Sequence, residues 1–276
     1  ATDGCAAVPG VVTLPNILAG HAQRGYHPTG TLVTDWAKAS SRNCIEHLAL
    51  KPHPKPLLMP SWADLTKLRS TYPWFDLASA SVDYRELTSL SNSQQISEAC
   101  DSARAIIGHG WRPPLSLFAY PNNRFTTSIN STVLNRCPIT LGRRYNGDAN
   151  TRSSVQSGFL NVYSINGGHC TNTALACSKL STRYRYTPSS TLAKLFHPAA
   201  GRWVVPQFYR LVAGTRSTGR LRWNCNGAAS SHYTFDTGGD STELYCATDY
   251  YAALANEPSY VVKNQTIRQV EAGWGL

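Results

Sequence analysis

The chain has 276 residues, of which 42% are hydrophobic and 10% aromatic, and its 26 Lys and Arg outnumber its 16 Asp and Glu to give a net charge of +10. This composition excludes a largely disordered chain, and no run approaches the roughly 18 apolar residues that a membrane-spanning helix needs. The charge either attracts a polyanion or simply keeps the protein in solution. No repeat or Gly/Ser linker divides the sequence, so we expect a single domain over residues 1–276.

Helices are predicted to alternate with short strands in the first half of the chain. Apolar spacing and capping residues predict helices at Leu14–Ala22, at Trp62–Leu68 with Ser61 as the cap, and at Ser93–Ile107. Short apolar runs predict strands at Thr31–Thr34, Phe75–Ser79 and Leu115–Tyr120. This alternation predicts a mostly parallel sheet, either open or closed into a barrel.

The second half of the chain carries a weaker signal. We predict a strand at Trp203–Tyr209, a helix at Ser241–Ala255, a strand at Ser259–Val262 and a short helix at Thr266–Ala272. Residues 140–190 show no clear pattern, apart from a half-exposed strand predicted at Thr182–Tyr186, where Tyr and Arg alternate.

Eight cysteines occur in the chain, and none forms a Cys-x-x-Cys pair. This usage favours disulfides over a zinc cluster or a redox motif, and it predicts a secreted, extracellular protein. The glycosylation sequons at Asn130 and Asn264 support secretion only weakly, because such triplets also arise by chance.

Two stretches carry motifs in a specific order. Asp76–Leu90 combines a strand with a later Leu-Thr-Ser-Leu, and Leu117–Phe125 contains Leu-Phe-Ala-Tyr-Pro. They resemble the polysaccharide deacetylase family (carbohydrate esterase family four), in which the first strand ends in Gly-Ser-His-Thr-x-x-His and the second reads Phe-Ala-Tyr-Pro. The other blocks that resemble the family in the same order are Ala1–Gly4, Leu14–Leu18, Trp203–Leu211 and Tyr251–Val270.

The resemblance implies an α/β fold, a distorted and incomplete (β/α) barrel of the deacetylase type, here stabilised by disulfides. In that family one aspartate and two histidines hold a divalent metal, usually zinc, and a second aspartate acts as the base. At the matching positions this chain has Ala80 and Tyr84 for the two metal-binding histidines, Thr2 for the base and Tyr209 for a catalytic histidine, while Asp3 alone matches a ligand. We therefore expect no metal cofactor, with zinc as the cofactor only if the protein is active.

Tyrosines occupy several of the degenerate positions. Tyr84, Tyr120 and Tyr209 either fill the volume of the missing imidazoles and metal, or stack on sugar rings at the mouth of the barrel. With Asn122 and Arg124, which follow the Tyr-Pro pair, they form the predicted glycan-contacting set.

For the cysteines, the resemblance implies one pairing, Cys100 with Cys137. The remaining pairings follow only from proximity along the chain, and sequence alone does not settle their connectivity. They are Cys5 with Cys44, Cys170 with Cys177, and Cys225 with Cys246.

The leading functional hypothesis is a secreted, non-catalytic protein that binds a polysaccharide or cell-wall glycan, or that serves in an extracellular assembly. Self-assembly would use the open edge of a barrel that lacks its first strand. One alternative is an active metal-dependent deacetylase of N- or O-acetylated polysaccharide with a rearranged site. Another is a cationic binder of an anionic polymer, with nucleic acid ranked last, through Arg143, Arg144, Arg183, Arg185, Arg202, Arg210, Arg216, Arg220 and Arg222.

Overall fold

The computed structural model describes residues 10, 12–38, 60–145, 149–165, 199–208, 210–216, 223–226, 244–255 and 266–275. Its centre is a six-stranded sheet in which every neighbouring pair of strands is parallel. The strands are β1 (Thr29–Leu32), β2 (Asp76–Ser79), β3 (Leu115–Ala119), β4 (Ile139–Tyr145), β5 (Phe159–Ser164) and β6 (Pro206–Gln207).

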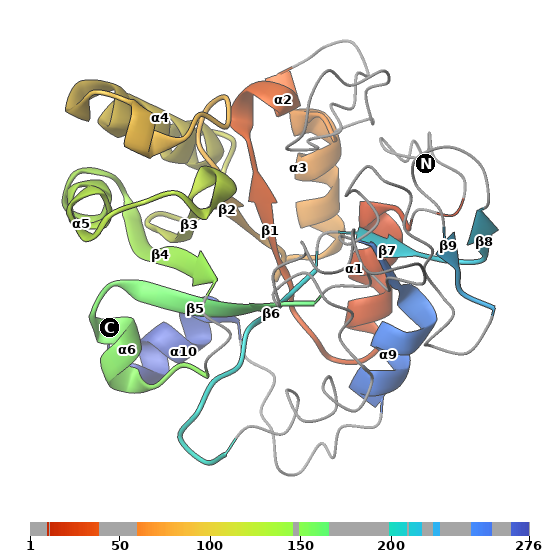
Figure 1. Ribbon diagram of the computed structural model, residues 1–276. Helices are drawn as coiled ribbons and strands as arrows, with labels where there is room; N and C mark the ends of the chain where they lie inside the picture. The colour runs from red at the N-terminus through yellow and green to blue at the C-terminus, as the bar shows by residue number, and fades with distance from the viewer. Residues whose placement is uncertain are drawn as a thin grey trace, which may run out of the picture.

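The order of the strands in the sheet follows their order in the chain, from β1 to β6. Each crossover therefore winds in the same direction, as in a (β/α) barrel, whereas a doubly wound sheet reverses its strand order. Helices α4 (Asn92–Gly108), α5 (Thr127–Arg136) and α6 (Arg152–Gln156) lie along the outside of the sheet (Figure 1). The predicted fold class, an incomplete (β/α) barrel, is confirmed as an open half-barrel.

Local sequence sets where the helices begin. Ser61 starts α3 (Trp62–Thr71) and Ser91 starts α4 with capping boxes, in which the serine and the third helical residue each satisfy a backbone N–H of the other. Thr126 caps α5 by accepting from the backbone N–H of Ile129. Two short elements, η1 (Leu87–Ser89) and η2 (Pro121–Asn123), follow β2 and β3.

The first core lies between the outer face of the sheet and helices α4 and α5. Phe118 and Tyr120 of the β3 segment are fully buried in it, and their rings meet edge to face with centroids 5.0 Å apart. The Tyr120 hydroxyl donates to Asn130 Oδ1 of α5 at 2.7 Å, a contact that depends on Gly142, because a Cβ there would collide with the Asn130 amide. Close packing and a neutral polar pair thus hold this layer together.

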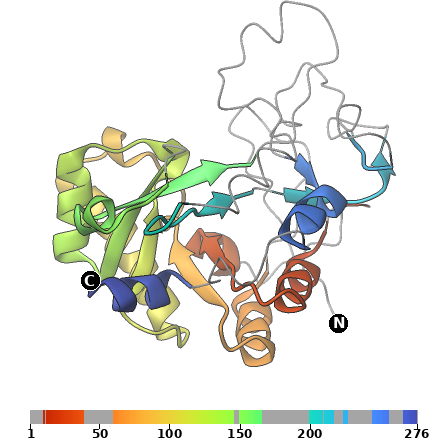
Figure 2. The ribbon, with the colours of Figure 1, turned by 90° about the horizontal axis from the view of Figure 1, so that it is seen from below.

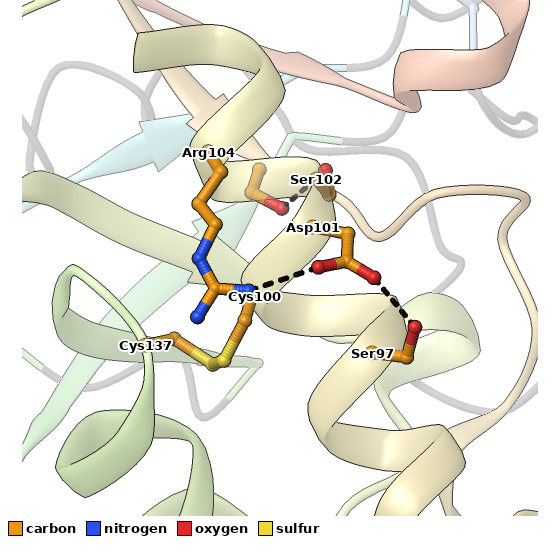
Figure 3. Close-up of a disulfide and its surroundings, with 7 residues drawn as sticks. Ser97, Cys100, Asp101, Ser102, Arg104 and Cys137 are labelled. Carbon is orange, nitrogen blue, oxygen red and sulfur yellow. Dashed lines mark hydrogen bonds and ion pairs between the residues drawn. A yellow bond between two sulfur atoms is a disulfide. The ribbon is translucent and has the colours of Figure 1, made fainter. Parts of the chain in front are cut away.

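A disulfide crosses the first core. Cys100 of α4 bonds to Cys137, the residue after α5, with their Cα atoms 4.6 Å apart (Figure 3). The same turn of α4 carries Asp101 on its exposed side, where the carboxylate accepts from Ser97 and Arg104. The pairing that the resemblance implied is therefore confirmed, and it links two helices that cover neighbouring strands.

A second region packs beside the half-barrel, away from α4 and α5 (Figure 2). It contains a parallel pair of strands, β7 (Arg210–Val212) and β10 (Leu244–Cys246), and two helices, α1 (Leu14–Ala22) and α9 (Ala247–Ala255). Gly10 and Val12 run along β7, with backbone bonds between Val12 N–H and the Leu211 carbonyl and between Ala213 N–H and the Gly10 carbonyl. An antiparallel pair, β8 (Thr215–Arg216) with β9 (Trp223–Asn224), extends from β7.

Cys225 bonds to Cys246 in this region, as predicted from their proximity in the chain. The other four cysteines, Cys5, Cys44, Cys170 and Cys177, lie outside the described residues.

The second core has a polar centre. His21 of α1 is 2% exposed; its Nδ1–H donates to the Ile17 carbonyl at 2.7 Å, and its Nε2 lies 3.0 Å from the Tyr250 hydroxyl of α9. Burial lowers the pKa of His21 and raises that of Tyr250, so both side chains are neutral at pH 7. The neutral imidazole accepts from the tyrosine hydroxyl, and Phe208 stacks on the imidazole ring.

Helix α10 (Ile267–Trp274) crosses the amino-terminal edge of the sheet. Arg268 Nε pairs with Asp76 of β2 at 2.8 Å, and Glu271 accepts from the Thr140 hydroxyl of β4. Ile267 belongs to the same buried apolar cluster as Leu117 and Leu160 of the inner face of the half-barrel. This helix therefore covers one end of the half-barrel.

Several sequence expectations differ from the structure. Of the helix predicted at Ser241–Ala255, residues 247–255 form α9, whereas Leu244–Cys246 form strand β10 because they pair with β7. Residues 241–243 lie outside the described part of the chain. Among the described residues of the strand predicted at Trp203–Tyr209, only Pro206–Gln207 form a strand, β6, and Trp203 forms an isolated bridge with Asn150. The strands predicted at Thr182–Tyr186 and Ser259–Val262 lie outside the described residues. None of the helices in the described part of the chain is long and apolar enough to cross a membrane.

Candidate functional site

The carboxyl-terminal edge of the sheet carries the candidate site. In a parallel sheet all strands end at the same edge, and the loops that follow them bring residues distant in sequence together. Here the segments after β1 and β2 meet, because Thr34 and Asp35 of α2 (Thr34–Lys38) donate their N–H groups to the carbonyls of Ser81 and Val82. The loop after β3 joins them through hydrogen bonds of Asn122.

One row of side chains crosses the inner face of the sheet just below this edge. Ala119 of β3 is in register with Arg143 of β4, and Arg143 is in register with Leu160 of β5. On the other side, Ala80 and Val33 continue the row beyond β2 and β1, and they form one buried apolar cluster with Ala119. Small side chains therefore form one half of the row and a guanidinium stands in the middle.

An aromatic pair covers the small half of the row. Trp36 of α2 and Tyr84 of the loop after β2 pack on Val33, Ala80 and Ala119, and their ring centroids are 5.7 Å apart. Both rings are partly exposed. This arrangement gives the edge an apolar surface on a rigid floor.

The loops after β2 and β3 hold an unusual backbone. Among the described residues, every non-glycine residue with a positive φ lies there, namely Ser81, Tyr84, Asn122 and Asn123. Such conformations cost free energy and cluster at binding and catalytic sites, where the surrounding structure enforces them.

Hydrogen bonds fix the loop after β2. The Ser81 hydroxyl accepts from the Tyr84 N–H at 2.9 Å, and the Glu98 carboxylate of α4 accepts from the N–H groups of Val82 and Asp83. Burial, followed by the hydrogen bond with the Asp83 carboxyl, raises the pKa of Glu98. Ser81 and helix α4 thus hold the backbone of the loop that carries Tyr84.

Polar groups lie beside the aromatic pair. The Tyr84 hydroxyl accepts from the Asn122 N–H at 3.4 Å, and the Asn122 amide donates to Glu86 Oε1 at 2.9 Å. Asn122 is exposed and Glu86 is partly exposed. An amide and a carboxylate next to aromatic faces are suited to the hydroxyls and the C–H faces of a sugar ring.

On the other half of the row, Arg143 is 6% exposed and forms a group with Tyr145 and Gln207. Arg143 Nη1 donates to Gln207 Oε1 at 3.2 Å, and the guanidinium carbon lies 4.4 Å from the centroid of the Tyr145 ring. The Gln207 amide donates to the Tyr145 hydroxyl at 2.6 Å. Sequence reasoning placed Arg143 on a cationic surface and did not consider Tyr145 or Gln207.

The sequence matches no model of a known protein family and no curated protein. Among solved structures it is similar to a Streptococcus pyogenes deacetylase in complex with acetate, at 15% identity and a TM-score of 0.39, over 52% of this chain and 56% of that one. It is also similar to a family 4 carbohydrate esterase from Streptomyces lividans in complex with acetate, at 14% identity and a TM-score of 0.35, over 94% and 81% of the two chains.

A third similar structure is that of a proposed polysaccharide deacetylase from Bacillus anthracis, at 11% identity and a TM-score of 0.32, over 43% of this chain and 30% of that one. The chain is distantly similar in structure to polysaccharide deacetylases. This agrees with the resemblance carried by the sequence motifs and concerns the fold alone.

The deacetylase metal does not fit the residues described at this edge. Ala80, at the first histidine position, has no ligand atom, and Tyr84, at the second, uses its hydroxyl to accept from Asn122. Within the described ranges, no three His, Cys, Asp or Glu side chains gather closely enough to hold a metal ion. The described residues at this edge therefore do not fit the deacetylase metal.

The structure brings only some of the predicted site residues together. Tyr84 and Asn122 meet at the edge, and Arg124 is exposed at the end of the same loop. Tyr120 points into the first core, where burial raises its pKa and leaves no ring face for a sugar. Thr2, Asp3 and Tyr209 lie outside the described residues.

Proposed function

We propose that this protein binds a saccharide at the carboxyl-terminal edge of its parallel sheet and does not carry out the metal-dependent hydrolysis of deacetylases. The observation that supports this most directly is the Trp36–Tyr84 pair, which lies on the row of small residues at the place where the deacetylase pattern has histidines. Aromatic rings of this kind bury the apolar face of a sugar, and the described residues at this edge include no group of three His, Cys, Asp or Glu that could hold a metal ion.

The neighbouring polar groups support the same proposal. Asn122 and Glu86 offer oxygen acceptors beside the rings, so a sugar stacked on Trp36 or Tyr84 has hydrogen-bond partners for its hydroxyls. The strained loops place these groups before the ligand arrives, which lowers the entropy lost on binding.

An extracellular location is part of the proposal. The two disulfides among the described residues, Cys100–Cys137 and Cys225–Cys246, persist in oxidising compartments. A glycan of a cell wall or of an extracellular matrix is the kind of partner that such a protein meets.

Titration calorimetry with a neutral trimer of N-acetylglucosamine tests the proposal. Trp36→Ala and Tyr84→Ala should each weaken binding by about tenfold or more, because each removes a stacking face. Trp62→Ala is the matched control, since this half-buried tryptophan stacks on His109 at the end of α4, away from the site. Equal weakening by all three variants would show that binding is not at this edge.

A second measurement addresses catalysis. The purified protein, with and without added zinc, is incubated with the same acetylated trimer, and released acetate is measured together with bound metal by elemental analysis. We expect no zinc-dependent acetate release. Stoichiometric zinc with acetate release would show instead that residues outside the aligned positions rebuild a hydrolytic site.

A further inference from the structure

The guanidinium of Arg143 is buried without a counterion among the described residues. Arginine stays charged at any pH a protein tolerates, and burial of a charge is costly unless it is paired. Asp and Glu side chains of the described ranges form ion pairs with Arg85, Arg104 and Arg268, whereas none lies within ion-pair distance of Arg143.

The partners that Arg143 does have satisfy only part of its donor capacity. Nη1 reaches Gln207 at 3.2 Å and Nη2 reaches the Tyr120 carbonyl at 3.4 Å, both long for charged hydrogen bonds. Nε is buried and makes no hydrogen bond. Contact with the Tyr145 ring offsets some of the desolvation but accepts no N–H in a defined direction.

Tyr145 adds a second donor at the same place. Because Gln207 Oε1 accepts from Arg143, the other end of the amide must be its NH₂, and this group donates to the Tyr145 hydroxyl oxygen. The hydroxyl proton of Tyr145 is then left to donate elsewhere. The group therefore presents unused donors and positive charge, with no acidic side chain to balance them among the described residues.

The position of Arg143 connects it to the candidate site. Arg143 lies in register with Ala119, and Ala119 is part of the floor under Trp36 and Tyr84. The guanidinium therefore belongs to the same row of inner-face residues as the floor of the aromatic pair, one strand beyond Ala119.

We propose that Arg143 and the Tyr145 hydroxyl form a subsite for a carboxylate carried by the bound glycan, so that the preferred ligand contains an acidic sugar unit. This inference rests on the proposed saccharide binding and adds the substrate class. A planar carboxylate matches the fork of a guanidinium, and it supplies the negative charge and the acceptors that Arg143 lacks.

The experiment compares two ligands and two arginines by titration calorimetry. The ligands are trigalacturonate, which is acidic, and the neutral N-acetylglucosamine trimer. Arg143→Gln is the test variant and Arg144→Gln is its control. The control substitution removes the same charge from the opposite face of β4, where Arg144 Nε donates to Asn161. Arg143→Lys keeps the charge but removes the fork, and circular dichroism checks the folding of each variant.

We expect the native protein to prefer trigalacturonate by about tenfold or more. Arg143→Gln should abolish this preference, Arg143→Lys should reduce it, and Arg144→Gln should leave it intact. Tyr145→Phe, which keeps the ring and removes only the hydroxyl, should reduce it too, and it tests the subsite even if both Arg143 variants fail to fold.

Three outcomes would overturn the subsite. If Arg144→Gln weakens acidic binding as much as Arg143→Gln, the attraction is general and electrostatic. If only the neutral trimer binds, and Trp36→Ala abolishes that binding, the saccharide site stands and the carboxylate subsite fails. If neither ligand binds, both the proposed function and the subsite fail.

Discussion

The two cores of this protein differ in the kind of polar groups that they bury. In the first core the buried pairs are neutral at every ordinary pH, as in the contact of Tyr120 with Asn130 and that of Ser79 with Ser102. In the second core the central pair is His21 with Tyr250, and His21 is a group that titrates near neutrality. We infer that mild acid leaves these hydrogen-bonded pairs of the first core unchanged, whereas protonation of His21 destabilises the second core.

The largest effect is expected from a cavity in the first core. Phe118→Ala should lower the free energy of unfolding by about 3–5 kcal/mol, because the ring is fully buried and close-packed. Urea denaturation measures this change. Leu211→Ala is the matching variant in the second core, where the side chain is also fully buried, and about 2–5 kcal/mol is expected. A loss below about 1 kcal/mol at Phe118 would contradict the close packing of this ring.

Removing either disulfide should also lower the free energy of unfolding, by a smaller amount than the cavity in the first core. Replacing Cys100 and Cys137 by alanine should cost about 2–4 kcal/mol, mainly through the freedom gained by the unfolded chain. The same change at Cys225 and Cys246 should cost about 0.5 kcal/mol less, because its sequence separation is 21 residues rather than 37. Thermal unfolding of the two double variants measures the difference. A larger loss from Cys225 and Cys246 would mean that native contacts, rather than loop length, dominate.

The smallest expected effect is a difference between the two cores in how their stability depends on pH. The folded pKa of His21 is lowered, so the unfolded chain binds more protons below its usual value of about 6.5, and stability falls as the pH drops below that point. Between pH 7 and pH 5 the protein should therefore lose stability through this group, because the unfolded chain takes up the proton that the buried imidazole resists.

The control for this prediction is His21→Gln, which cannot titrate. Urea denaturation at pH 7 and pH 5 should show a smaller pH dependence for the variant than for the native protein. An equal loss of stability on acidification in the native protein and in His21→Gln would show that His21 does not make the second core sensitive to acid.

Local signals predicted much of the half-barrel from sequence. Helix α1 was predicted with its observed bounds, and α3, α4 and β3 were each predicted to within a few residues. Each of these elements carries its own cap or apolar pattern. In contrast, β4 was missed because Gly142, Arg143 and Arg144 interrupt its apolar pattern, although Leu141, Arg143 and Tyr145 alternate along one face. Strand β10 was missed because it depends on its pairing with β7, a non-local contact.

The candidate site could be predicted from sequence only where its residues follow strands with a local signal. Ala80, Tyr84 and Asn122 follow strands that the sequence motifs identified, so their meeting at one edge could be expected. Trp36 lies on a short helix without a pattern of its own, and Gln207 reaches Arg143 only through the register of distant strands. Such partners depend on tertiary structure, which no local window of sequence encodes.

Helix α10 has a consequence for the order in which the chain folds during synthesis. Asp76 and Thr140 leave the ribosome well before Arg268 and Glu271, their partners in the folded protein, so the amino-terminal edge of the sheet stays uncovered until residues 267–274 emerge. Strands β1 to β4 can pair before then, but the apolar surface that α10 covers at the amino-terminal edge is exposed to other nascent chains. A chain stalled before α10 would thus present the apolar surface that chaperones bind.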